Sequence, residues 1–152
     1  MLEYLVFCAR LQGVPKDRIE PRLRDMVQLC GLNREKHKTI GELSQGYRQR
    51  VGLAQAMIHD PEILIIDEPT TGLDPNQIVE IRELIKELGK EKTVILSTHI
   101  LPEVEATCDR ILIINRGRIV ADGTSESLRQ QAKGKQTLSV RIGGAAPDVI
   151  RP

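Results

Sequence analysis

Residues 63–75 read ILIIDEPTTGLDP, and this stretch decides the expected fold. It opens with four apolar, mostly β-branched residues, which is typical of a strand covered on both faces in a parallel sheet. Two carboxylates, Asp67 and Glu68, follow at the strand end, where open α/β sheets place ligand-binding groups. Asp74 before Pro75 is a typical helix N-cap and first helical residue. The stretch therefore predicts a strand, a polar turn and a helix in that order.

The chain after this stretch continues the alternation of strand and helix. The helix that begins at Asp74 ends at Gly89, and residues 93–97 form a second strand. A third strand at 110–114 turns back at Asn115-Arg116-Gly117 into a hairpin with 118–121. Leu138, Val140 and Ile142 alternate in a last short strand.

The chain before this stretch is helical. Apolar residues predict helices at 2–11, from Ile19 to Cys30, and at 49–58, with a loop at 41–46. Pro21 fits the second helix only if it lies in the first turn, where its absent N–H costs little.

Composition limits the classes of function. The 152 residues are enough for one globular unit. Lys and Arg (22) balance Asp and Glu (21), and the signs are interspersed, so no electrostatic nucleic-acid footprint is predicted. The cysteines, Cys8, Cys30 and Cys108, are widely separated, which indicates reduced core thiols of a cytosolic protein. No apolar run approaches the ~20 residues that span a bilayer, so a membrane role requires a partner.

Asp67, Glu68 and His99 are the candidate catalytic residues. A carboxylate that ends a buried strand can coordinate Mg²⁺ on a nucleotide. His99 lies two residues past the strand that ends at Ser97, so it belongs to the same edge of the sheet. The alternatives are a solvated acidic turn and an ordinary surface histidine.

The segment Leu43-Ser44-Gln45-Gly46 is a candidate phosphate site. It lies at the start of a helix, where a hydroxyl and unpaired backbone N–H groups suit an anion. The alternative is that Ser44 only caps the helix. Asp74 has the same ambiguity.

Four segments taken in order resemble the ABC ATPase family. LSQGYRQR (43–50) is similar to its signature motif, residues 63–70 to the Walker B strand with the adjacent glutamate, GLD (72–74) to the D-loop, and STH (97–99) to the switch-histidine segment. The amino-acid sequence around the D-loop and the histidine is most similar to that of ATPases of ABC-2-type exporters, including those named for gliding motility.

The resemblance implies ATP hydrolysis with Mg²⁺. Asp67 would hold Mg²⁺ through water, Glu68 would polarise the attacking water, and His99 would contact the γ-phosphate. Ser44, Gln45 and Gly46 would bind ATP held by the opposite subunit, and Asp74 would lie at the shared interface. The implied partners are a second ABC ATPase subunit and a transmembrane permease, with no nucleic acid. The implied location is cytoplasmic, at the inner face of the cell membrane.

The implied fold is α/β, a partial P-loop NTPase (RecA-like) with a mostly parallel sheet. We expect a helical subdomain with the signature motif at 1–60, the ATPase core at 61–132 and the start of a C-terminal extension at 133–152. Family topology also implies that strand 93–97 pairs in parallel with strand 63–66. Strand 111–114 would be left across a gap or held mainly by its hairpin.

One departure from the family limits the expected activity. No Gly-x-x-x-x-Gly-Lys-Ser/Thr occurs in the 152 residues, so we interpret the chain as a C-terminal portion, without the first strand and phosphate loop, that is inactive alone. An alternative is a split or degenerate subunit that supplies only its signature surface to an intact ATPase. A relative acting on DNA or ribosomes is disfavoured, because the sequence has no long coiled coil and no basic patch.

Overall fold

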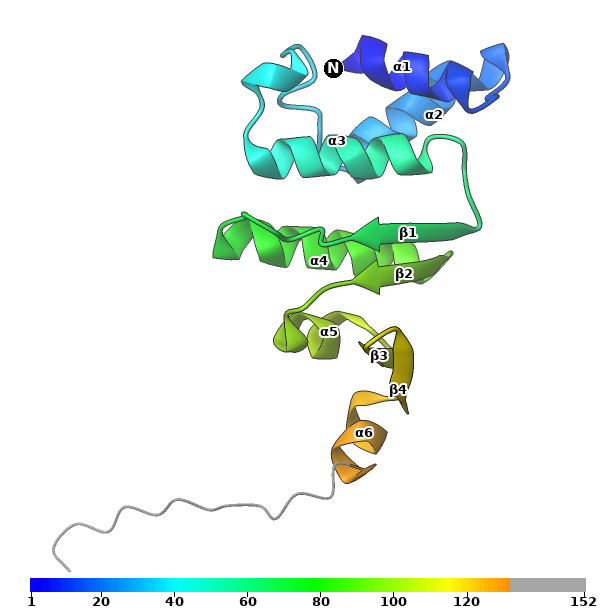
Figure 1. The fold of residues 1–152 in the computed structure, drawn as a ribbon. Coiled ribbons are helices and arrows are strands. Elements are labelled where there is room, and N and C mark those ends of the chain that lie inside the picture. Colours follow the sequence, from blue (N-terminus) through cyan, green and yellow to red (C-terminus); the bar gives the residue numbers. More distant parts are fainter. Residues whose placement is uncertain (132–152) are drawn as a thin grey trace, which may run out of the picture. The chain divides into compact units, whose positions relative to one another are not determined.

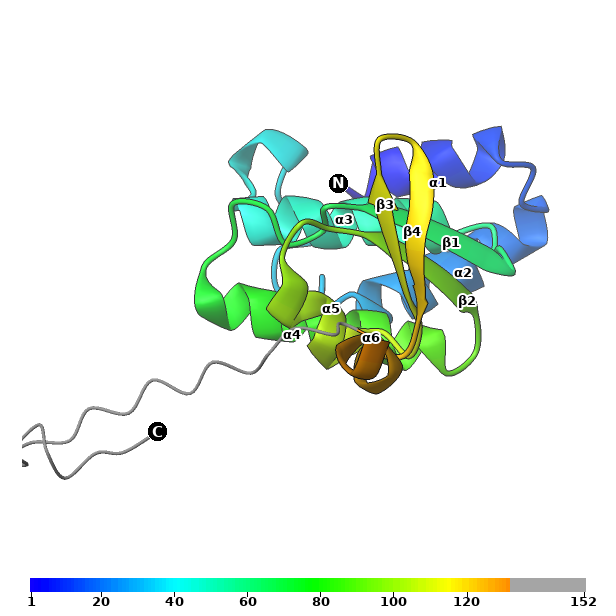
Figure 2. The ribbon, with the colours of Figure 1, turned by 60° about the horizontal axis from the view of Figure 1, so that its bottom comes forward.

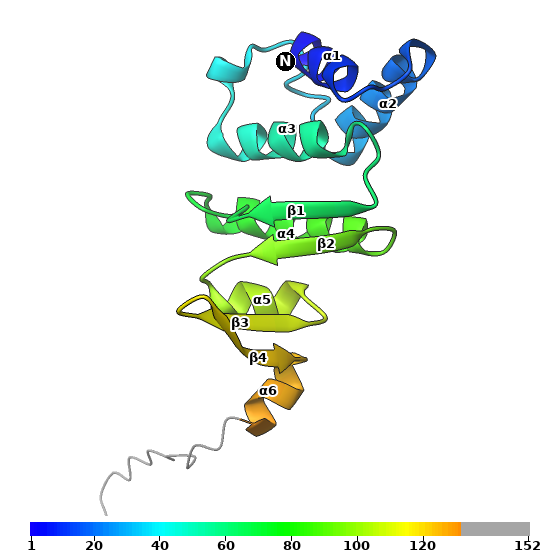
Figure 3. The same ribbon diagram turned by 45° about the vertical axis from the view of Figure 1, so that its right-hand side comes forward.

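Two parallel strands organise the first part of the structure, a computed structural model that describes residues 1–131. Strand β1 (Ile63–Asp67) pairs with β2 (Thr93–Ser97), and the register places Asp67 opposite Ser97. Figure 3 shows the two arrows side by side and pointing the same way. The predicted parallel pair is confirmed, and both strands end at the same edge.

Helix α4 (Pro75–Gly89) connects the two strands and covers one face of the pair (Figure 1). The Asp74 side chain caps the helix by accepting hydrogen bonds from the backbone N–H groups of Asn76 and Gln77, both at 3.0 Å. Four buried side chains of α4 pack into the main hydrophobic core: Ile81, Leu84, Ile85 and Leu88. A short helix, α5 (Leu101–Thr107), follows β2.

The other face of the strand pair is exposed, so the prediction of cover on both faces is wrong for the described residues. Leu64 is 3% exposed, whereas its neighbour Ile65 is 74% exposed. Successive side chains of a strand point to opposite faces. Leu64 therefore packs into the core cluster from one face, whereas Ile63, Ile65 and Ile95 are exposed on the other.

The helices before β1 pack around their own part of the core. They are α1 (Leu2–Leu11), α2 (Lys16–Leu29), the 3-10 helix η1 (Ile40–Glu42) and α3 (Gln45–Met57). The largest fully buried side chains of the chain before β1 are Leu5, Cys30, Leu32, Met57 and Ile58. This cluster continues into the α4 side chains, so the helices and the strand pair share one hydrophobic core.

Two details of these helices correct the sequence-based expectations. Pro21 lies inside α2, beyond the first turn in which it is predicted to lie. The buried side chains of Ile19, Met26 and Val27 hold the helix on both sides of the proline. Helix α3 begins at Gln45 rather than at Gln49, because Ser44 acts as its N-cap.

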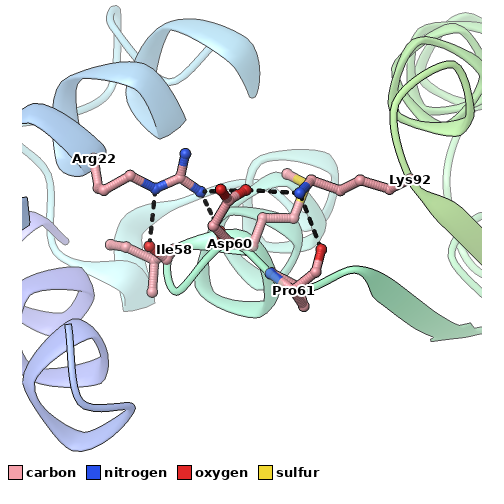
Figure 4. A network of polar contacts seen from close by, with 6 residues as sticks. Arg22, Ile58, Asp60, Pro61 and Lys92 are labelled. Carbon is pink, nitrogen blue, oxygen red and sulfur yellow. Dashed lines mark hydrogen bonds and ion pairs between the residues drawn. The ribbon is translucent and has the colours of Figure 1, made fainter.

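A polar network joins the helices to the start of the strand pair (Figure 4). Arg22 of α2 donates to the carbonyls of Met57 and Ile58 at the end of α3, at 2.7 and 3.1 Å. Asp60, whose backbone is left-handed with φ 61°, receives hydrogen bonds from Lys92 (2.6 Å) and Arg22 (3.4 Å). The Lys92 hydrogen bond is the main cause that lowers the pKa of Asp60. Asp60 therefore contributes to stability through its charged form.

A second compact unit begins at Asp109, whereas the first runs from Met1 to Cys108. In the second unit β3 (Ile111–Asn115) and β4 (Arg118–Gly123) form the predicted antiparallel hairpin, yellow in Figure 2. Its turn residues Arg116 and Gly117 have φ 50° and 72°, as a type I′ turn requires. Helix α6 (Ser125–Gln131) follows.

The α/β class is confirmed, and so is the prediction that strand 111–114 is held by its hairpin and does not pair with β2. A mostly parallel sheet is not observed among the described residues. The described strands form two sheets of two strands each, one parallel and one antiparallel, because β3 finds its backbone partners in β4. The boundaries at 60/61 and 132/133 stay predictions. The predicted extension at 133–152 and the predicted strand from Leu138 lie outside the described residues. Within residues 1–131, every helix is too short or too polar to cross a membrane.

We predict that Asp60→Asn lowers the free energy of unfolding at pH 7 by less than about 1 kcal/mol, because the carboxylate is largely exposed and screened. A lowered pKa in the folded state stabilises the fold above the ordinary pKa of 3.8, and this contribution is lost as the pH falls through the lowered value. Urea unfolding at pH 7 and in acid measures the difference, which should vanish in acid. Glu20→Gln, in an exposed pair with Arg24, is the matched control and should change nothing. An equal loss for both variants at pH 7 would contradict the network's role.

Candidate functional site

The predicted residues Asp67, Glu68 and His99 lie together at the edge where β1 and β2 end. Asp67 is the last residue of β1 and accepts a hydrogen bond from the hydroxyl of Ser97, its partner in the strand register. The backbone N–H of Glu68 donates to the Ser97 carbonyl at 2.9 Å. The end of β2 therefore orients both acidic residues.

Glu68 and His99 form a direct contact. His99 Nδ1 lies 2.7 Å from Glu68 Oε1, and the Thr71 hydroxyl donates to Glu68 Oε2 at 3.2 Å. The Glu68 backbone is left-handed, with φ 46°, which is strained for a residue with a side chain. The glutamate side chain is 33% exposed and the imidazole 77% exposed, so both are accessible to a ligand.

The charges of this pair reinforce each other. The hydrogen bond from His99 is the main cause that lowers the pKa of Glu68. The same hydrogen bond is the main cause that raises the pKa of His99. Glu68 is therefore a carboxylate at neutral pH, and a larger fraction of His99 is protonated there than of an isolated histidine. A carboxylate and an adjacent imidazole can orient a water molecule and receive an anionic group.

Ser44 and Asp74 each cap a helix. The Ser44 hydroxyl accepts from the backbone N–H of Tyr47 at 3.4 Å at the start of α3, and Asp74 caps α4. Within residues 1–131, no hydrogen bond joins either side chain to Glu68 or His99. Capping is thus confirmed for both residues, and their nucleotide roles stay predictions.

The first turn of α3 lies against the turn that follows Glu68. Gln45 Nε2 donates to the Thr71 carbonyl at 3.0 Å. Gly72, with φ 75°, lies beneath the Gln45 amide, and a Cβ there would collide with that amide. Gly46 lies against the side chain of Gln77 in α4, because an added Cβ would lie 2.8 Å from Gln77 Cδ. Small residues therefore allow the two predicted nucleotide-binding segments to touch.

A cleft of about 380 Å³ opens beside Gly46. Its lining includes Arg34 and Arg50, and Arg50 is also ion-paired with Glu80 of α4. Positive side chains next to a helix N-terminus suit a phosphate group.

Asp67 fits a hydrated Mg²⁺ bound to a nucleotide. Mg²⁺ keeps several waters and is usually held by one or two carboxylates together with substrate phosphates. Asp67 is exposed at the end of its strand and is oriented by Ser97. Among the described residues there is no cluster of three or more His, Cys, Asp or Glu side chains that would form an all-protein metal cage.

The hydroxyls of Ser97 and Thr71 orient Asp67 and Glu68, a role that no sequence motif indicates. The parallel register places Ser97 opposite Asp67, so an alignment of the two strands would have identified Ser97. No spacing rule identifies Thr71, because its contact depends on the left-handed backbone of Glu68.

Known proteins share this arrangement of a parallel strand pair and a helical layer. A solved structure of cbiO1 from Clostridium perfringens, part of the ABC transporter complex cbiONQ, has a TM-score of 0.75 and 32% identity over 84% of this chain and 51% of that one. Residues 9–71 match the ABC transporter family model. The predicted resemblance to an ABC transporter ATP-binding domain is therefore confirmed in both sequence and fold.

Relatives named as ABC transporter ATP-binding proteins extend this similarity beyond residues 9–71. The uncharacterized ABC transporter ATP-binding protein YxlF of Bacillus subtilis is 40% identical over 91% of this chain and 48% of its own length. The bacitracin transport ATP-binding protein BcrA of Bacillus licheniformis is 38% identical over 85% of this chain and 42% of its own length. The chain thus spans about half the length of the ABC transporter relatives that it matches.

We predict that Gly72→Ala lowers the free energy of unfolding by at least about 1 kcal/mol, because alanine is strained at positive φ and its methyl group meets Gln45. Gly52→Ala in the interior of α3 is the matched control. No atom lies within 4 Å of its new Cβ, so it should stabilise by up to about 1 kcal/mol. Chemical denaturation of both variants measures the two effects, and wild-type stability of Gly72→Ala would refute the close contact.

Proposed function

We propose that this chain supplies the hydrolytic residues of an ATP-hydrolysing subunit in an ABC exporter. The observation that carries the proposal is the contact between Glu68 and His99, directly beside Asp67, at the carboxyl edge of two parallel strands. This edge is where open α/β sheets bind ligands. The family match supports ATP as the substrate.

Each residue at this edge has a distinct task in hydrolysis. Asp67 would hold Mg²⁺, which would neutralise charge on the phosphates. Glu68 accepts a hydrogen bond from the attacking water and orients it toward the γ-phosphate. Its lowered pKa keeps Glu68 ionised at neutral pH, so it can accept this hydrogen bond and polarise the water. His99 donates a hydrogen bond to the γ-phosphate.

The start of α3 completes the site of a second subunit. The Ser44 hydroxyl and the backbone N–H groups of Gln45 and Gly46 are at a helix N-terminus, which favours a phosphate. We assign them to the γ-phosphate of ATP held by the opposite subunit, with Asp74 at the shared interface. Hydrolysis then requires a dimer of ATPase subunits.

The transport function requires a transmembrane permease, which places the subunit at the inner face of the cell membrane. Support comes from relatives named for bacitracin transport, Nod factor export and linearmycin resistance. We assign the subunit to the ABC-2-type exporter group because of the residues at 67–75 and 97–103.

Replacement of Glu68 by Gln in the full-length gene product should lower the ATPase rate by about 100-fold or more and leave ATP binding unchanged, because the amide is a far poorer proton acceptor. Steady-state phosphate release and nucleotide titration measure the two effects. Glu62→Gln, just before the opposite end of β1, is the matched control and should retain the wild-type rate. An unchanged rate for Glu68→Gln would favour a subunit that supplies only its signature surface.

The 152-residue chain alone should show negligible ATPase activity, because it contains no Gly-x-x-x-x-Gly-Lys-Ser/Thr loop to position the phosphates. Titration with a fluorescent ATP analogue and Mg²⁺, followed by a turnover assay, tests this expectation. Binding at millimolar ATP followed by turnover would contradict it.

A further inference from the structure

Thr70 and Glu103 form a buried polar pair behind the proposed catalytic residues. Thr70 is 3% exposed and Glu103 is 7% exposed, and the Thr70 hydroxyl donates to Glu103 Oε2 at 2.6 Å. Thr70 lies two residues after Glu68, and Glu103 lies four residues after His99, in the first turn of α5. The bond therefore ties the segment that carries Glu68 to the segment that carries His99.

A buried glutamate requires an explanation. Burial of a carboxylate is costly unless it is hydrogen-bonded, and a hydrophobic residue would fill the same space without that cost. Within residues 1–131, no side-chain hydrogen bond joins Thr70 or Glu103 to Asp67, Glu68 or His99. Their hydrogen bond thus acts on the site only through the backbone segments that it joins.

The turn after β1 needs such an anchor. Glu68 has a left-handed backbone, and strain of this kind persists only where surrounding contacts hold it. The side-chain contacts of Glu68 with His99 and Thr71 are open to solvent. The Thr70–Glu103 hydrogen bond is buried, so water does not compete with it.

We propose that Thr70 and Glu103 are positioning residues that hold Glu68 against His99 for hydrolysis. The kinetic part of this inference rests on the proposed function, whereas the geometric part does not. Neither side chain touches the substrate in this role. Both act by keeping the turn that contains Glu68 at a constant distance from the start of α5.

The geometric test measures the pKa of His99 in the full-length protein by NMR titration of its imidazole. Glu68→Gln should lower this pKa, because Glu68 is the main cause of its rise. The size of that drop reports the Glu68–His99 contact. Glu103 also raises the pKa of His99, but its charge is the same in the two members of each comparison and cancels.

The drop in the pKa of His99 caused by Glu68→Gln should be at least halved in a Thr70→Val background. It should be retained in a Thr70→Ser background, since serine keeps the hydroxyl. Glu103→Gln should also retain it, because the amide oxygen still accepts from Thr70. Thr70→Val leaves the Glu103 carboxylate buried without a hydrogen bond, which can prevent the protein from folding. In that case the double variant Thr70→Val/Glu103→Leu removes both polar groups and should give the same reduced drop in the pKa of His99. An undiminished drop in either folded protein overturns the proposal.

The kinetic test compares kcat with KM for ATP in the same variants. We expect Thr70→Val to lower kcat by about 10-fold to 100-fold with little change in KM, and Thr70→Ser to restore it. Equal losses for Thr70→Val and Thr70→Ser would overturn a role for the hydrogen bond. If Glu68→Gln leaves hydrolysis unchanged while the pKa differences hold, the proposed function fails and the positioning pair stands. If Glu68→Gln abolishes hydrolysis but the pKa drop is undiminished in Thr70→Val, the positioning role is refuted and the proposed function stands.

Discussion

The parallel pairing of β1 with β2 is the constraint on which the rest of the first unit depends. Backbone hydrogen bonds set the register that places Asp67 opposite Ser97. Parallel strands require a crossover, which α4 provides, so the chain must leave β1 through a tight turn before Asp74 caps the helix. The acidic residues of that turn and the histidine that follows β2 reach the same edge as a consequence of this topology.

The contacts at this edge are individually weak. His99 and Glu68 form an exposed pair, and exposed pairs contribute little to stability because water and salt screen them. Their alignment depends instead on backbone geometry. Glu68 is held in a left-handed conformation between its N–H bond to Ser97 and the buried bond of Thr70 to Glu103. A rigid support beneath an accessible surface is the arrangement that a reactive site requires.

The helical layer is joined to the strand pair at both ends of the strands. Before β1 and β2 begin, Asp60 and Lys92 form a polar network with Arg22 of α2. After β1 ends, Gln45 at the start of α3 bonds the Thr71 carbonyl, and glycine at position 72 makes room for it. The start of α3 is therefore in direct contact with the turn that follows Glu68.

The amino-acid sequence predicts the features that depend on local chemistry. The caps at Ser44 and Asp74, the two parallel strands, the hairpin turn and the family resemblance all follow from short runs of residues, because capping, strand propensity and turn geometry act over a few positions. It did not determine that α2 accommodates Pro21, that one face of β1 stays open, or that Thr70 meets Glu103. These features depend on which side chains, distant in the chain, become buried together. Only the tertiary structure decides that, because burial is a property of the packed core rather than of any local period.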